Sequence, residues 1–150
     1  MSAVVTDPSP AAAPTALALP ESRVLSVDDL TVRFSTSERV VDAVKNLSFH
    51  VERGETLAIV GESGSGKSVT SLALMRLVEW GGGRIVSGRM DFRRRSGQVL
   101  DLARASDSAM AGIRGADIAM IFQEPMTSLN PVFTAGDQIA EAIAIHQHKD

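Results

Sequence analysis

The chain has 150 residues, a formal net charge of −3 and no cysteine. This length suits one domain, and the lack of cysteine excludes a disulfide framework and a thiolate metal site. The acidic balance argues against a general nucleic-acid binder, which is normally basic. No apolar run approaches the roughly 18 residues that a membrane-spanning helix needs.

Residues 1–22 are expected to form a disordered tail. Four of the six prolines fall in this stretch, between alanines and small polar residues, a composition that buries too little apolar surface to fold. A signal peptide would begin with basic residues and continue with an unbroken apolar stretch. Here the first basic residue is Arg23, and prolines interrupt throughout. Residues 23–150 are therefore expected to form the folded domain.

Alternation of apolar and polar residues predicts an antiparallel layer in the first part of the domain. Residues 30–34 alternate as expected for a strand with one buried face, and residues 44–51 repeat the pattern. Residues 84–92 alternate more loosely and are expected to return to the same layer.

Two predominantly apolar runs, at 56–60 and 118–122, predict a second kind of strand. Continuous apolar runs of this length are typical of strands buried on both faces of a parallel sheet. The fold class expected is therefore α/β, with a parallel core and an antiparallel β-layer.

Residues 61–68 fit the phosphate-binding pattern G-x-x-x-x-G-K-[ST] at every fixed position. The apolar run 56–60 precedes them, and helical spacing of apolar residues follows over 69–78. Strand, glycine-rich turn and helix form the context in which this pattern predicts a nucleotide site. A dinucleotide-binding pattern fails, because Val69 stands where its third glycine would be.

The residue types of this loop suit a polyphosphate. Glycines let the backbone turn tightly and approach the ligand, and the amides of residues 64–69 can point inward at the helix N-terminus. Lys67 is expected to reach the β- and γ-phosphates, and Ser68 to offer its hydroxyl to Mg²⁺. The residues expected to contact ATP here are Gly61, Ser63, Gly64, Ser65, Gly66, Lys67, Ser68 and Val69.

Gln123 directly follows the apolar run 118–122. Ligands of open α/β sheets bind at the carboxyl ends of strands, so Gln123 and the phosphate loop are expected to face one nucleotide. A neutral amide there can ligate Mg²⁺ or orient a water. From position alone, a glutamine that merely caps its strand is an equal alternative.

Three further features favour structural roles. Residues 93–95 are a run of arginines, which predicts a solvated edge rather than a surface for nucleic acid or lipid. Thr134 and Asp137 predict a capped, amphipathic helix. His146 and His148 are expected to be solvated rather than to bind metal.

The phosphate loop together with residues 120–131 resembles the nucleotide-binding subunits of ABC transporters. More narrowly, it is similar to the dipeptide/oligopeptide/nickel importer family, over most of residues 24–147. The resemblance implies an ATPase at the cytoplasmic face of the inner membrane, peripheral to a permease and paired with a second ATP-binding domain. It implies no nucleic-acid partner and leaves the solute open among peptides, glutathione and nickel.

The same resemblance assigns roles to individual residues. Gln123 matches the Q-loop glutamine, which senses Mg²⁺ and the attacking water, so Gln123 and Lys67 are the expected catalytic residues. Residues 124–131 would lie near the coupling helix of the permease. Phe34 matches the aromatic position that stacks on adenine, although its strand alone indicates a core phenylalanine.

Later motifs of the family are not found in the sequence. The L-S-G-G-Q-like signature, the Asp-Glu pair and the switch histidine follow the Q-loop in the family. The chain is therefore expected to be the N-terminal half of one ATP-binding domain, binding nucleotide weakly at best and inactive alone. The alternatives are a non-hydrolysing nucleotide-binding regulator and a non-transport ABC ATPase, the latter disfavoured by the segment 127–131.

Overall fold

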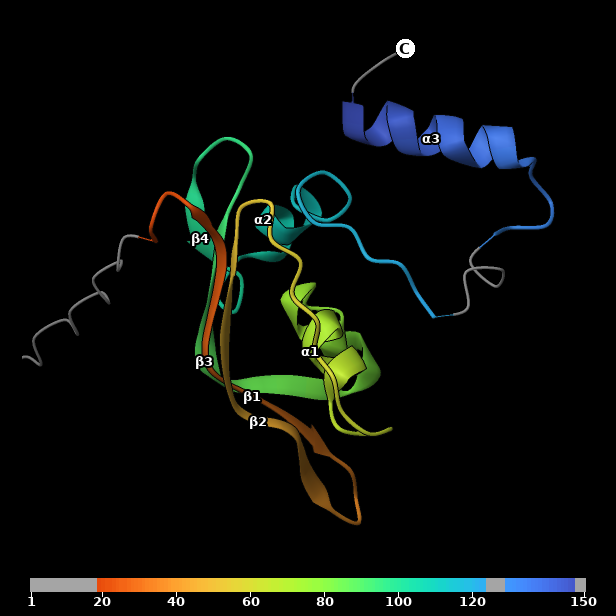
Figure 1. Cartoon of the computed structure of the whole chain (residues 1–150). Coiled ribbons are helices and arrows are strands. Elements are labelled where there is room, and N and C mark those ends of the chain that lie inside the picture. The colour runs from red at the N-terminus through yellow and green to blue at the C-terminus, as the bar shows by residue number, and fades with distance from the viewer. Residues whose placement is uncertain (1–18, 124–128, 148–150) are drawn as a thin grey trace, which may run out of the picture.

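The computed structural model describes residues 19–123 and 129–147. In Figure 1 a twisted sheet carries helix α1 on one side, and the chain then leads through α2 to α3, which lies away from the sheet. The elements are β1 (Arg23–Ser35), β2 (Val40–Glu52), α1 (Lys67–Leu74), the 3-10 helix η1 (Val78–Gly81), β3 (Gly83–Arg93), β4 (Val99–Asp101), α2 (Asp107–Ala111) and α3 (Ala135–Gln147).

The four strands form one antiparallel sheet in the order β2-β1-β3-β4. The long central strand β1 pairs with β2 on one side and with β3 on the other. This confirms the antiparallel layer predicted from alternation, because β1 turns Leu30 and Val32 into the core while Arg33 stays on the surface.

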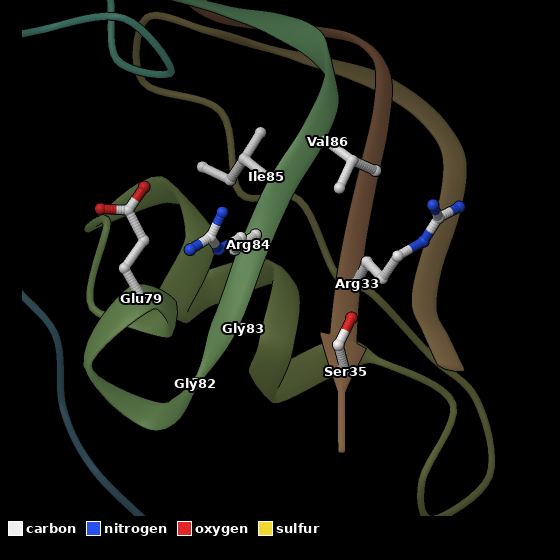
Figure 2. Close-up of a pocket in the computed structure, with 8 residues that line it drawn as sticks. All are labelled: Arg33, Ser35, Glu79, Gly82, Gly83, Arg84, Ile85 and Val86. Atoms are coloured by element: carbon white, nitrogen blue, oxygen red, sulfur yellow. The ribbon is translucent and has the colours of Figure 1, made fainter. Parts of the chain in front are cut away.

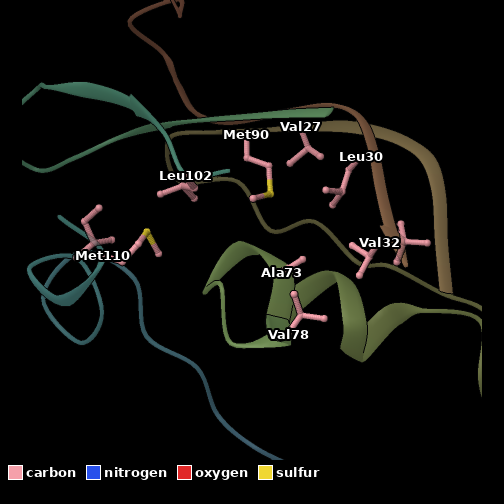
Figure 3. Packing of buried hydrophobic residues seen from close by; sticks show 10 residues of the cluster. Val27, Leu30, Val32, Ala73, Val78, Met90, Leu102 and Met110 are labelled. Carbon is pink, nitrogen blue, oxygen red and sulfur yellow. The ribbon is translucent and has the colours of Figure 1, made fainter. Parts of the chain in front are cut away.

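The hydrophobic core lies between this sheet and the segment α1–η1 (Figure 3). Each side supplies aliphatic side chains that are almost fully buried, and such burial is the main favourable contribution to folding. Its members are Val27, Leu30, Val32, Val44, Ala73, Val78, Met90, Leu102, Met110 and Ile113. The core therefore fixes α1, whose first residues belong to the phosphate loop, against the sheet.

The predicted buried strands at 56–60 and 118–122 are not strands in the described structure. Val60 and Ile121 are 88% and 91% exposed, and the parallel pairing found in the described ranges is a single bridge between Arg114 and Ile118. A buried parallel strand needs hydrogen-bonded neighbours and cover on both faces. The described residues provide neither for these two segments, so a parallel sheet is not seen.

The arginine run 93–95 departs from its prediction. Arg94 Nε lies 2.6 Å from Asp117 Oδ2, and its Nη2 donates to the Gly112 carbonyl at 2.9 Å. Burial alone would raise the pKa of Asp117. The hydrogen bonds from Arg94 and from the Arg95 amide outweigh it and hold this pKa below its ordinary value. Arg94 therefore ties the β3–β4 hairpin to the turn before residue 118 and is not a solvated edge.

Side-chain hydrogen bonds hold the start of the described chain and the start of α3. Most of the predicted tail, residues 1–18, lies outside the described residues, whereas Leu19 is buried and its carbonyl accepts a hydrogen bond from Arg93. At the start of α3, Thr134 Oγ1 accepts from the Asp137 amide at 3.1 Å, and the Asp137 carboxylate accepts from Thr134. This confirms the predicted capping pair.

Candidate functional site

The glycine-rich loop joins residues 56–60 to the start of α1, and its glycines hold conformations that other residues rarely adopt. Gly64 and Gly66 have φ of 81° and 90°, in the left-handed region that favours glycine. A Cβ on Gly66 would collide with the Ala43 carbonyl oxygen and lie 3.2 Å from the Val44 side chain. The loop can therefore press its backbone against β2 only with glycine at this position.

Helix α1 presents its N-terminus to this loop. Gly66 is the N-cap and contributes no side-chain hydrogen bond, and the Gly66 carbonyl accepts from the Thr70 amide at 2.8 Å. The first amides of α1 are thus not capped by a side chain within the described structure. Uncapped amides and the helix dipole together favour an anion at this point.

Lys67 folds its side chain back over the loop. Its Nζ donates to the carbonyls of Gly61 and Glu62 at 2.8 and 2.6 Å, and to Ser65 Oγ at 3.2 Å. The ammonium group therefore sits among the loop's own oxygens, which hold positive charge within the turn. Phosphate oxygens are stronger acceptors than these neutral groups.

A cavity of about 540 Å³ brings the phosphate loop and residue 123 together. Lys67 and Ser68 line it from the start of α1, and Gln123 lines it from the segment after the turn at 113–118. The remaining lining residues are Leu57, Ile59, Ser71, Leu72, Met120, Ile121 and Phe122. Sequence reasoning did not single out Ser71 and Leu72, although their spacing three and four residues after Ser68 puts them on its helix face.

Phe34 lies outside this cavity. It stands near the end of β1, opposite Val41 of β2 and Gly83 of β3. Its half-buried ring packs against the core and lies within 2.8 Å of the place where a Cβ on Gly83 would stand. In the described structure Phe34 therefore fills space between the strands and η1.

A second and larger cavity, of about 840 Å³, lies elsewhere, at the junction of η1 and β3 (Figure 2). None of the predicted site residues lines it. Arg33, on its wall, pairs with Asp42 at 2.6 Å through Nε and at 3.1 Å through Nη2. This pair raises the pKa of Arg33 and lowers that of Asp42, so that the charge of Arg33 is compensated within the sheet.

One known protein family matches the part of the chain that contains the glycine-rich loop and residue 123. The sequence model of the ABC transporter family matches residues 44–150. The chain belongs to the ABC transporter family. Its glycine loop, helix and antiparallel layer fit the P-loop nucleotide-hydrolase fold of the ATP-binding domains of ABC transporters.

Several curated proteins similar to this chain carry one name, "Glutathione import ATP-binding protein GsiA". The protein of Pectobacterium atrosepticum is 66% identical over 134 residues, which are 89% of this chain and 22% of the relative. Those of Salmonella typhimurium and Shigella flexneri are 63% and 58% identical over 83% and 87% of the chain, or 20% and 21% of the relatives. The chain thus spans about a fifth of their length.

The donor groups at the cavity suit a hard cation that is shared with a ligand. Within residues 19–123 and 129–147, no group of three or more His, Cys, Asp or Glu side chains could hold a metal by itself. Ser68 and Gln123 offer a hydroxyl and an amide oxygen, which match the preference of Mg²⁺ for few protein ligands beside phosphate and water. In the same ranges, no helix has the length and apolar character needed to cross a bilayer.

Proposed function

We propose that this chain is the phosphate-loop and Q-loop part of an ABC importer's ATP-binding subunit. ATP binding and hydrolysis would drive uptake of glutathione or a peptide through a membrane permease at the cytoplasmic face of the inner membrane. The observation that carries this proposal is the single cavity lined by Lys67, Ser68 and Gln123. Family membership and the names of the relatives support it.

The loop would hold the triphosphate of ATP. The amides of residues 64–69 would donate to phosphate oxygens, with Gly61, Ser63 and Ser65 shaping the turn. Lys67 would exchange its contacts with neutral loop oxygens, at 2.6 to 3.2 Å, for charge-assisted hydrogen bonds to the β- and γ-phosphates. Lys67 would therefore form its stronger hydrogen bonds only when a polyanion is bound.

Mg²⁺ would be held by Ser68 Oγ and the Gln123 side-chain oxygen, together with phosphate oxygens and water. The ion would neutralise charge that develops on the phosphates during transfer. Gln123, which lines the same cavity, would also orient the attacking water. Its amide carries no net charge, so this role leaves the charge balance of the site unchanged.

In the complete protein, we expect segments 56–60 and 118–122 to pair as parallel strands. Their exposed apolar side chains are those of strands that require cover on both faces. A second ATP-binding domain would close the nucleotide site, and residues 124–131 would contact the permease. Residues 124–128 lie outside the described residues, so this contact stays a proposal from the family.

Phe34 is proposed to stack on adenine, and this role can be separated from its packing role. Phe34→Leu keeps an apolar side chain against the core but removes the aromatic face. We expect a stability loss of about 1 kcal/mol and a loss of Mg·ATP affinity of about tenfold, within the range of aromatic stacking energies. Calorimetry and urea unfolding measure both quantities. An unchanged affinity would assign Phe34 to the core alone.

The proposed function is tested by calorimetric titration of the full-length protein with Mg·ATP. Lys67→Ala removes a charge-assisted contact to phosphate, and we expect its affinity to fall about tenfold or more. Lys45→Ala is the matched control, because Lys45 is exposed on β2 and does not line the cavity. Wild type and Lys45→Ala should bind alike.

Two results would contradict the proposal. One is a wild-type protein that releases no heat with Mg·ATP. The other is a Lys67→Ala variant that binds as tightly as wild type.

A further inference from the structure

A tight turn over residues 113–118, here called the hub, leads into the segment that carries Gln123. The Ile118 amide donates to the Ile113 carbonyl at 3.1 Å, and the Gly115 amide donates to the Ile118 carbonyl at 2.8 Å. Ile113 is fully buried in the core. The hub is therefore a closed, internally bonded unit.

Arg114 attaches this hub to α1. Its Nε donates to the Met75 carbonyl oxygen at 2.8 Å in a partly buried contact. Met75 is the C-cap of α1 and is itself buried. A guanidinium at this point satisfies a terminal carbonyl of the helix and complements the negative end of its dipole.

Helix α1 therefore connects two elements of the proposed site. Lys67 and Ser68 stand at its first turn, and the Arg114 contact holds its other end. From the hub the chain runs through residues 119–122 to Gln123, which lines the same cavity as Lys67 and Ser68. Residues 119–122 form no strand pairing in the described structure. The position of Gln123 relative to Ser68 thus depends on where the hub is attached to α1.

We infer that Arg114 is a positioning residue for the nucleotide site, setting the distance between Gln123 and the phosphate loop through its bond to Met75. This inference rests on the proposed function. The hub has a second polar attachment, from Asp117 to Arg94, which holds it to the β3–β4 hairpin and not to α1. Its Ile113 side chain packs in the core cluster that also contains Ala73 of α1. Of the two polar contacts, only the one from Arg114 therefore holds the hub to α1.

Steady-state ATP hydrolysis by the full-length protein tests the inference. Arg114→Met keeps length and apolar contact but removes the donor. We expect kcat to fall about tenfold, because small misplacements of a positioned group have large effects on rate. KM for Mg·ATP should stay within about twofold, since Lys67 and the loop amides remain in place. Arg114→Lys retains a cation and a donor and should recover part of the rate.

A cross-linking experiment measures the position of the segment 119–123 relative to α1 without nucleotide. Residues 1–150 contain no cysteine. With any cysteine outside them replaced by serine, a disulfide between Leu72→Cys and Ile121→Cys, which both line the cavity, reports how close the segment lies to α1. Arg114→Met should slow its formation several-fold. Arg104→Met is the control, because the Arg104 side chain is 66% exposed and pairs with Asp101 outside the hub.

Unchanged kcat and unchanged cross-linking in Arg114→Met would overturn the inference. So would equal losses in Arg114→Met and Arg114→Lys accompanied by a raised KM, which would indicate general damage to the binding site. A wild-type protein without ATP binding would refute the proposed function instead, and the cross-linking arm would still decide the role of Arg114.

Discussion

Gly66→Ala is expected to destabilise the protein by about 3 kcal/mol and to abolish measurable Mg·ATP binding. A left-handed conformation costs a residue with a Cβ about 1–2 kcal/mol, and Gly66 has φ of 90°. The added methyl group would also collide with the backbone carbonyl of Ala43. Because the atom is backbone in a paired strand, relief requires moving the loop away from β2. Urea unfolding and calorimetry measure the two effects.

Gly64→Ala is the matched control for the collision. Gly64 has a similar φ of 81°, but a Cβ on it would meet nothing within 4 Å. Only the conformational cost of about 1–2 kcal/mol should then remain. Equal losses of stability in the two variants would show that contact with β2 does not shape the loop.

Arg94→Met is the second substitution with a large expected effect, a loss of about 3 kcal/mol at neutral pH. The Asp117 side chain is 6% exposed and lies 2.6 Å from Arg94. Removing Arg94 leaves the buried Asp117 carboxylate without its paired charge, with the Arg95 amide still donating to it at 3.2 Å. Arg104→Met breaks an exposed pair with Asp101, and we expect it to cost less than about 0.5 kcal/mol.

The loss in Arg94→Met should depend on pH. In wild type the pKa of Asp117 lies below its ordinary value, so this carboxylate stabilises the fold above that value, and the contribution is lost as pH falls through the lowered pKa. The difference between wild type and Arg94→Met should therefore be full at neutral pH and shrink below about pH 4. Urea unfolding at both pH values measures it. A difference that is independent of pH would contradict the role of the ion pair.

Local patterns were sufficient to predict the antiparallel layer and the glycine-rich turn at the start of α1, whereas phosphate binding by this turn stays a prediction. Alternation of apolar and polar residues in β1 indicates burial on one face. The glycine–lysine–serine pattern predicts a turn with backbone conformations that only glycine adopts readily. The helix after the loop was predicted to extend to residue 78, but α1 ends at Leu74. Arg76, with φ of 51°, turns the chain out of the helix there.

Long-range contacts could not be predicted in the same way. The apolar runs 56–60 and 118–122 indicate that these segments need apolar neighbours, but they do not indicate which segments supply them. In the described structure, apolar side chains of both runs are exposed. The arginine run looked like a solvated edge because its partners, Asp117 and the carbonyl of Leu19, are distant in sequence. Gln123 lines the cavity with Lys67 and Ser68, although residues 118–122 before it are not a strand in the described structure, and its role stays a prediction.

Hydrogen exchange measured by mass spectrometry tests the central claim most directly. The account states that Mg·ATP is held between the phosphate loop and the segment ending at Gln123. On adding Mg·ATP to the full-length protein at a concentration near its Kd, we predict slower exchange in peptides that cover both 61–69 and 118–123, and much weaker protection of both at the same concentration for Lys67→Ala. Protection of neither segment, or of the loop alone, would contradict the account.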